Sequence, residues 1–210
     1  MLVACVTATS TESLRFDGEA PDAVRVTVDR GDLTIHGGAH AVSLTAESRA
    51  RGSSRGRAQE LAAAADLRAE IVGDELHVEA IAPDHGWTDL TLEVPDGLLL
   101  AVDLDDGALE GRGLRGSLEG RVRGRGVDLE LFPEACELTV LGPVTLSLPF
   151  GLDYALTAFT DPEWGADIVD LGFDTFVQTS DRVEGTSGRA DVPVELQVIG
   201  GPLLVLEATL

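Results

Sequence analysis

The chain has 210 residues, of which 44% are hydrophobic, so one large domain or two small ones can form a core without metal or disulfide support. Its 37 acidic residues outnumber 15 arginines, there is no lysine, and the formal net charge is −22. A surface this acidic repels phosphate backbones, which argues against nucleic acid as a partner. No apolar run reaches the 18 or so residues that predict a membrane span.

Residues 1–22 are expected to be a leader and tether, followed by a single β domain over 23–210. The segment from Leu2 to Cys5 resembles the lipobox of bacterial lipoproteins, whose cysteine is acylated and becomes the mature N-terminus. The Thr- and Ser-rich residues that follow are similar to the spacer found after such a box. Only Met1 precedes the box, where a charged and apolar signal segment is expected. The alternatives are lipidation of Cys5, with more sequence upstream, and a chance match.

Strand patterning dominates the first half of the domain. Period-2 alternation predicts strands at 24–28, 33–35, 42–46, 69–71, 76–80 and 90–94. Residues 49–56 are predicted to be a loop. The segment 57–71 contains the one predicted helix, capped by Ser53 or Ser54 and ending near Asp66, because its alanines favour helix.

Glycine-punctuated alternation organises residues 90–148. Short Leu and Val runs are interrupted at Gly107, Gly126 and Gly142, at intervals of 19 and 16 residues. Repeats of this length with a turn in each predict strands that stack and bury their apolar faces against one another. The expected fold is therefore all-β, a single-domain β-solenoid of the right-handed β-helix kind with one short helix. A two-sheet β-sandwich is the alternative.

The same features carry a resemblance to a known family. A strand, a glycine turn and a strand, then a helix, the Gly73-Asp74 hairpin and the run LEVPDGLLLAVDLDDGALEG at 92–111 together resemble the putative-adhesin family of bacterial envelope domains, whose function is unassigned. The resemblance covers 23–148 and, more weakly, 183–208. It implies a β-solenoid with no catalytic residues to transfer.

The strand pattern weakens between 149 and 185, which predicts a long loop, and six of the chain's nine aromatic residues lie there among acidic side chains. The candidate binding residues are Tyr154, Phe159, Trp164, Phe173 and Phe176. Trp164 lies in the turn Asp161–Gly165, which is expected to be exposed, as functional loops often are. The alternative is a hydrophobic plug over the end of the solenoid.

No catalytic residue, cofactor or metal site is predicted. The GxGxxG match at 111–116 precedes further glycines instead of a helix, so a dinucleotide site is not expected. The aspartates at 103–106 lack the ligand spacing of a calcium loop. Arginine clusters at 49–57 and 112–125 are either ionic ladders on strands or an anion site. Cys136 is expected to be a small core residue.

The leading functional hypothesis is a non-enzymatic binding or scaffold domain of the cell envelope, whose partner is an envelope protein or a glycan. Its contact with a membrane is expected only through a lipid anchor, and a cytoplasmic location stays open. The alternatives are a carbohydrate-active β-helix enzyme, which needs carboxylates grouped on one face, and a structural protein that self-assembles through its ends.

Overall fold

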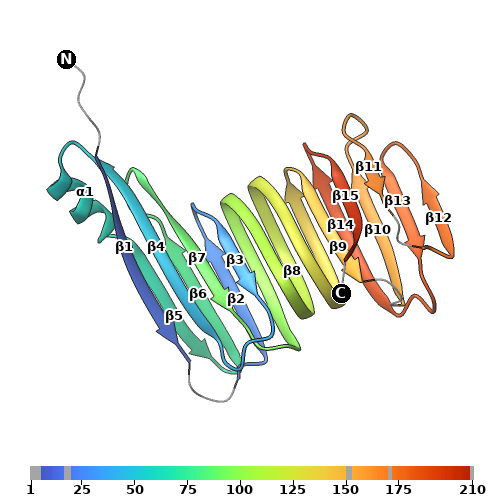
Figure 1. Ribbon diagram of the computed structural model, residues 1–210, viewed down its shortest axis with the longest axis horizontal. Helices are drawn as coiled ribbons and strands as arrows, with labels where there is room; N and C mark the ends of the chain where they lie inside the picture. Colours follow the sequence, from blue (N-terminus) through green and yellow to red (C-terminus); the bar gives the residue numbers. More distant parts are fainter. Residues whose placement is uncertain (1–5, 17–19, 150–152, 170–171, 209–210) are drawn as a thin grey trace.

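The structure, a computed structural model, describes residues 6–16, 20–149, 153–169 and 172–208. It is all-β with one short helix, as predicted (Figure 1). The elements are β1 (Val6–Arg15), β2 (Ala23–Val28), β3 (Leu33–His36), β4 (Ser43–Gly52), α1 (Arg55–Ala62), β5 (Asp66–Val72), β6 (Glu75–Ile81), β7 (Gly86–Glu93), β8 (Leu98–Leu141), β9 (Val144–Pro149), β10 (Tyr154–Thr160), β11 (Ala166–Ile168), β12 (Thr175–Gln178), β13 (Arg182–Thr186), β14 (Val192–Ile199) and β15 (Leu203–Ala208).

The strands pair in two rows, which both include parts of β8. Row one contains β1, β4, β7, β3, β8, β9, β15 and β11. Row two contains β5, β6, β2, β8, β14, β10, β13 and β12. The pairs nearest the middle of both rows are parallel, whereas β1, β4 and β5 at one end and β12 and β13 at the other pair antiparallel with their neighbours.

In-register pairing builds the core. Val24 lies opposite Leu76 on β6 and Leu100 on β8, and Val26 is matched in the same way two residues later. These side chains are buried, and the inward positions of both rows form one continuous cluster. Period-2 alternation therefore places a Val or Leu column on the inside of each row and polar residues on the outside.

The glycines that punctuate the sequence lie where neighbouring corners touch. The 99–104 part of β8 pairs with β2 in row two, and its 109–112 part pairs with β3 in row one, so the chain changes rows near Gly107. A Cβ added at Gly107 would overlap the carbonyl oxygen of Gly31. Only glycine lets the two corners approach so closely.

The prediction of a tether over residues 1–22 is wrong for 6–15. This segment is strand β1, which pairs antiparallel with β4 from Val6 opposite Gly52 to Arg15 opposite Ser43. No residue of β1 is buried, because β1 is the edge strand of row one, and its inward positions include the small residues Ala8 and Ser10. The alternation of large apolar residues that reveals a strand is therefore missing. Leu2–Cys5 lies outside the described residues.

The predicted loop at 49–56 and the helix boundaries also change. Residues 49–52 complete β4, where Ala50 and Gly52 are buried and their small side chains conceal the alternation. Ser54 caps α1 as predicted, accepting a hydrogen bond from the Arg57 amide. The helix ends at Ala62 rather than Asp66, because Asp66 begins β5 and pairs with Ile81.

Residues 153–186 contain strands rather than one long loop. β10 lies beside β13, and β11 lies beside β15. The order in space differs from the order in sequence, since β14 pairs with β8 on one side and with β10 on the other. β15 lies in the same way between β9 and β11. The last two strands of the chain, β14 and β15, therefore each lie in space between two strands that come earlier in the sequence.

Candidate functional site

The five candidate aromatic residues come from one end of the molecule, the end opposite β1 and α1 (Figure 1). They divide into three rings in contact and two separate exposed residues. The Phe173 ring contacts both Tyr154 and Phe176, whereas Phe159 and Trp164 are exposed to solvent.

The three rings in contact extend from the core to the surface. The Tyr154 and Phe173 rings meet edge to face with centroids 5.8 Å apart, and Phe173 stacks on Phe176 at 5.6 Å. A Cβ at Gly185 on β13 would overlap the Phe173 ring, so this ring covers a strand position that has no side chain. Tyr154 is fully buried and offers no surface to a partner. The plug alternative thus describes Tyr154 and Phe173, while Phe176 remains 45% exposed.

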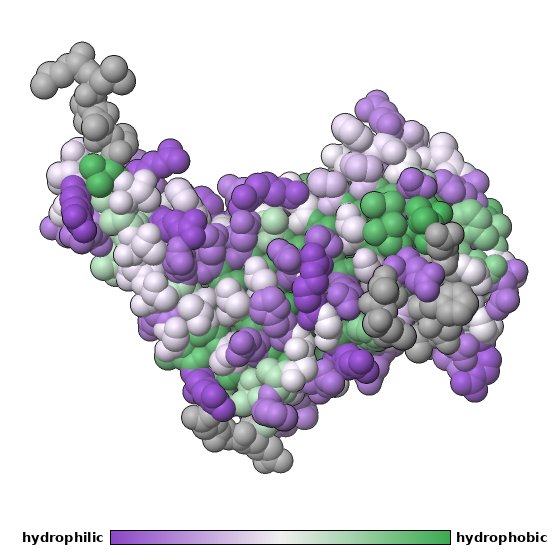
Figure 2. Space-filling view, viewed as in Figure 1, coloured by the Kyte–Doolittle hydropathy of each residue, from purple (hydrophilic) through white to green (hydrophobic). Residues whose placement is uncertain are grey.

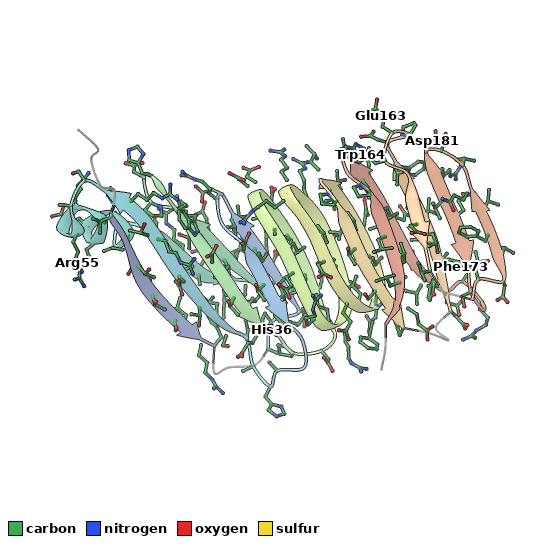
Figure 3. All side chains as sticks on the ribbon, turned by 45° about the horizontal axis from the view of Figure 1, so that its top comes forward. His36, Arg55, Glu163, Trp164, Phe173 and Asp181 are labelled. Atoms are coloured by element: carbon green, nitrogen blue, oxygen red, sulfur yellow. The ribbon has the colours of Figure 1, made fainter. Side chains whose placement is uncertain are left out.

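Trp164 is 56% exposed in a turn that hydrogen bonds hold in place (Figure 3). The Asp161 carbonyl oxygen accepts from the amides of Trp164 and Gly165, at 3.0 and 3.1 Å. The Asp161 carboxylate accepts from the Gly200 amide at 2.6 Å, which fastens the turn to the segment between β14 and β15. Gly165 has a φ of +68°, a conformation that suits glycine. The indole is therefore presented on a fixed backbone.

Phe159 and Arg182 form a second exposed feature on the outer side of row two. The two residues are opposite each other on β10 and β13, and the guanidinium lies 5.3 Å from the ring centroid. Phe159 is 49% exposed. Row one is also partly apolar at this end, since Leu204 and Leu206 on β15 are only half-buried, and Figure 2 shows a hydrophobic area there.

Carboxylates line up on the outer side of row two. Glu137 on β8 lies directly opposite Glu195 on β14, and Glu119 and Glu137 line one shallow depression of about 490 Å³. All three side chains are exposed, and within the described residues none has an ion pair or hydrogen bond. The structure therefore groups acidic side chains on one face, although it does not bury them.

The structure also places the other residues that the sequence offered for metal, thiol and nucleotide chemistry. Among the described residues, no group of three or more His, Cys, Asp or Glu side chains could hold a metal ion. Burial raises the pKa of the Cys136 thiol to about 12, as a core residue requires. The GxGxxG match lies within β8, where no helix follows. Cys5, the predicted lipidation site, lies outside the described residues.

The arginine clusters mainly form ionic ladders. Arg112 pairs with Asp128 at 2.7 Å, and Arg123 pairs with Asp105 at the same distance. These contacts join successive passes of β8, as the ladder alternative requires. Arg51 is different, because its guanidinium lies 5.7 Å from the centroid of the Trp87 ring.

Trp87 marks a feature that sequence reasoning missed. With Gly86 it lines a depression of about 440 Å³ at the corner between the two rows, together with Arg30–Asp32, Arg49, Asp89, Asp106 and Arg125. These residues come from separate turns and strands, and the pairing of β7 with β3 and β4, and of β3 with β8, brings them together. The one local signal was an aromatic residue directly after the Pro83–Gly86 turn.

No helix in the described part of the chain is long and apolar enough to cross a membrane.

Comparison with known proteins gives a likeness of fold. No protein-family model matches the chain, and no curated protein does. The solved structure of a "putative cell adhesion protein" from Clostridium sporogenes is similar over 96% of this chain and 100% of its own, with 9% identity and a TM-score of 0.55. This shared fold agrees with the resemblance to the putative-adhesin family.

Two further solved structures are more distant. One is a "putative lipid binding protein" from Parabacteroides distasonis, with 10% identity, a TM-score of 0.37, and coverage of 71% of this chain and 70% of its own. The other is a "putative adhesin" from Bacteroides fragilis, with 8% identity, a TM-score of 0.32, and coverage of 94% and 97%.

Proposed function

We propose that this protein is a non-enzymatic binding domain of the bacterial cell envelope, adhesin-like in role. The observation that carries the proposal is the exposed Trp164 on a hydrogen-bonded turn, at the end of the molecule opposite β1. Aromatic anchors on a fixed backbone surrounded by polar residues concentrate binding energy, because little conformational entropy is lost on binding.

The scaffold of this domain is a β-solenoid in our proposal. In-register parallel pairs in both rows support it, with Val26 opposite Val102 in row two and Leu33 opposite Leu109 in row one. Sandwiches are built mainly from antiparallel strands. In this chain antiparallel pairs occur toward the ends of the rows, where β4, β5 and β13 adjoin the parallel strands.

The proposed cellular location is the outer side of the membrane. The lipobox resemblance at Leu2–Cys5 and the name of the similar fold from Clostridium sporogenes support it. Acylation of Cys5 would attach the end that contains β1. The Trp164 turn would then face away from the membrane, where an envelope glycan or protein can reach it.

The test compares binding by the purified domain and its variants to isolated cell-wall glycan and to envelope proteins. Trp164→Ala should abolish most binding and leave the melting temperature nearly unchanged, since the side chain is exposed. Val177→Ala is the matched control, because Val177 is 57% exposed at the same end but lies outside the turn. Equal binding by the two variants would refute the proposed site. A large loss of stability in Trp164→Ala would assign Trp164 to the plug.

The proposed cellular location is tested separately. Expressed from its natural start, the protein should incorporate labelled fatty acid and partition with membranes, and Cys5→Ser should abolish both. An unlabelled wild type would reduce the lipobox to a chance match.

A carbohydrate-active enzyme is the second candidate, because Glu119, Glu137 and Glu195 lie on the outer side of row two. Parallel neighbours are about 4.8 Å apart, close to the separation of about 5–5.5 Å between the carboxyl groups of retaining glycosidases. Incubation with a panel of polysaccharides should release reducing ends if this candidate is right, and Glu119→Gln or Glu137→Gln should stop the release. If the wild type releases no reducing ends from any polysaccharide, the enzyme candidate is excluded and the non-enzymatic binding role is retained.

A further inference from the structure

We call the depression beside Trp87 the Trp87 depression. It lies along the edge where the chain passes from row two to row one, as do Gly107 and the Trp164 turn. Within this edge it belongs to the half of the molecule that contains β2, β3 and β7. Its volume of about 440 Å³ falls within the range of small-molecule sites. It is separate from the Trp164 turn, and the inference below does not depend on the proposed function of that turn.

A hydrogen-bonded frame holds the lining in place. Arg49 donates to Glu47 at 2.6 Å and pairs with Asp89 at 3.6 Å. Asp89 also accepts from the Asp32 amide at 2.9 Å. The Asp32 carboxylate in turn accepts from the Ala108 amide at 2.8 Å and pairs with Arg125. The site is therefore preorganised by contacts that span β4, β7, β3 and β8.

Three polar groups of the lining have no protein partner. Within the part of the chain that the structure describes, the guanidinium of Arg30, the carboxylate of Asp106 and the indole N–H of Trp87 make no hydrogen bond or ion pair. Arg30 and Asp106 are exposed and Trp87 is half-buried. In a chain with 37 acidic residues, an arginine beside aspartates would be expected to pair with one.

We propose that the Trp87 depression binds a saccharide. Its three arginines are balanced by three aspartates, so an anion would face carboxylates and a cation would face guanidinium groups. A sugar hydroxyl both donates and accepts, which matches the free donor on Arg30 and the free acceptor on Asp106. The Trp87 ring supplies an apolar surface for the C–H face of a sugar and an N–H donor at its edge.

The chain offers a direct optical test because it contains two tryptophans, one in each candidate site. In Trp164→Phe, Trp87 is the remaining indole fluorophore. Titration with glucose, galactose, N-acetylglucosamine and their β-linked oligomers should give a saturable fluorescence change with at least one of them. Calorimetric titration of the unsubstituted protein should give the same dissociation constant.

Variants of the free polar groups test the assignment. Arg30→Ala and Asp106→Ala should each weaken saccharide binding by about 3- to 10-fold, the value of one hydrogen bond. Arg55→Ala and Asp74→Ala are matched controls, since both side chains are exposed, lie outside both depressions and have no side-chain partner in the described chain, and they should bind like the parent. Trp87→Ala, followed by calorimetry, should show no binding.

Several results would overturn the proposal. The first is the absence of saturable binding by every sugar in the panel, and the second is equal affinity of Arg30→Ala and Arg55→Ala. The third is saturable binding of inorganic phosphate that no sugar displaces, which would make the depression an anion site. Trp164→Ala should retain the binding measured here, so failure of the Trp164 proposal and failure of this one give different results.

Discussion

The hydroxyl of Tyr154 is, among the described residues, the buried side-chain oxygen without a hydrogen-bond partner. Burial raises its pKa, and the Glu207 carboxylate adds to the rise. A hydroxyl desolvated without a partner costs about 1–3 kcal/mol. We therefore expect Tyr154→Phe to increase the free energy of unfolding by about 1 kcal/mol, measured by urea denaturation at pH 7. Tyr154→Ala, which also removes the ring, should lower it by about 3–5 kcal/mol. A destabilised Tyr154→Phe would mean that the hydroxyl has a partner.

Gly107 and Gly56 provide a matched pair for the corner packing. A Cβ at Gly107 overlaps a backbone oxygen, whereas a Cβ at Gly56 in α1 meets nothing within 4 Å. Gly107→Ala should lower the free energy of unfolding by about 1–3 kcal/mol through overpacking. Gly56→Ala should raise it by about 0.5–1 kcal/mol, because alanine favours helix. Thermal denaturation of both variants checks the difference in sign. A neutral Gly107→Ala would show that the corners can separate.

The clustering of aromatic residues in the sequence identified the end of the molecule that contains the candidate residues. It could not show which of these residues are buried and which are exposed. Tyr154, Leu156 and Ala158 alternate inward on β10, which places Phe159 on the opposite face. The sequence contains this alternation, which the prediction of a loop over 149–185 overlooked. The exposure of Trp164 agrees with its predicted turn. The Trp87 depression could not be predicted, because its lining depends on the register between β3, β4, β7 and β8.

At the scale of elements, β1 should be the least protected of the long strands. It has no buried residue, and it lies at the edge of row one. Local opening of such a strand costs little free energy, since few apolar contacts are lost. Hydrogen–deuterium exchange followed by mass spectrometry should show faster exchange in peptides from 6–15 than in peptides from 98–104. Equal protection would indicate that β1 opens only with the whole domain.

Strands with Val or Leu at their inward positions were predicted well. The strands predicted at 24–28, 33–35 and 76–80 correspond to β2, β3 and β6, where the inward side chains are large and buried. β12 shows no alternation of burial, because all four residues are exposed at an edge. The end of α1 was misplaced since pairing of Asp66 with β6 overrides the helix preference of the alanines before it.

At the scale of the whole molecule, the ends bear on the self-assembly alternative. Row one ends at β1, against which α1 packs, and at the three-residue strand β11, whereas row two ends at β5 and at the short strand β12. Short end strands and a covering helix limit further pairing, and a net charge of −22 opposes association of copies. Sedimentation velocity at about 150 mM salt, where charges about 8 Å apart are already screened, should show one species whose size is independent of concentration. Growth with concentration would support self-assembly.

β14 and β15 lie between strands that come earlier in the sequence, and this affects folding during synthesis. A chain emerging residue by residue presents β10 and β11 before the strands that link them to β8 and β9 exist. The Trp164 turn, whose Asp161 is fastened to Gly200, can be completed only after synthesis has passed that glycine. A nascent or prematurely terminated polypeptide that stops before Val192 would keep β10–β13 undocked and open to proteases. Display of Trp164 in its final form therefore requires that synthesis has passed Gly200.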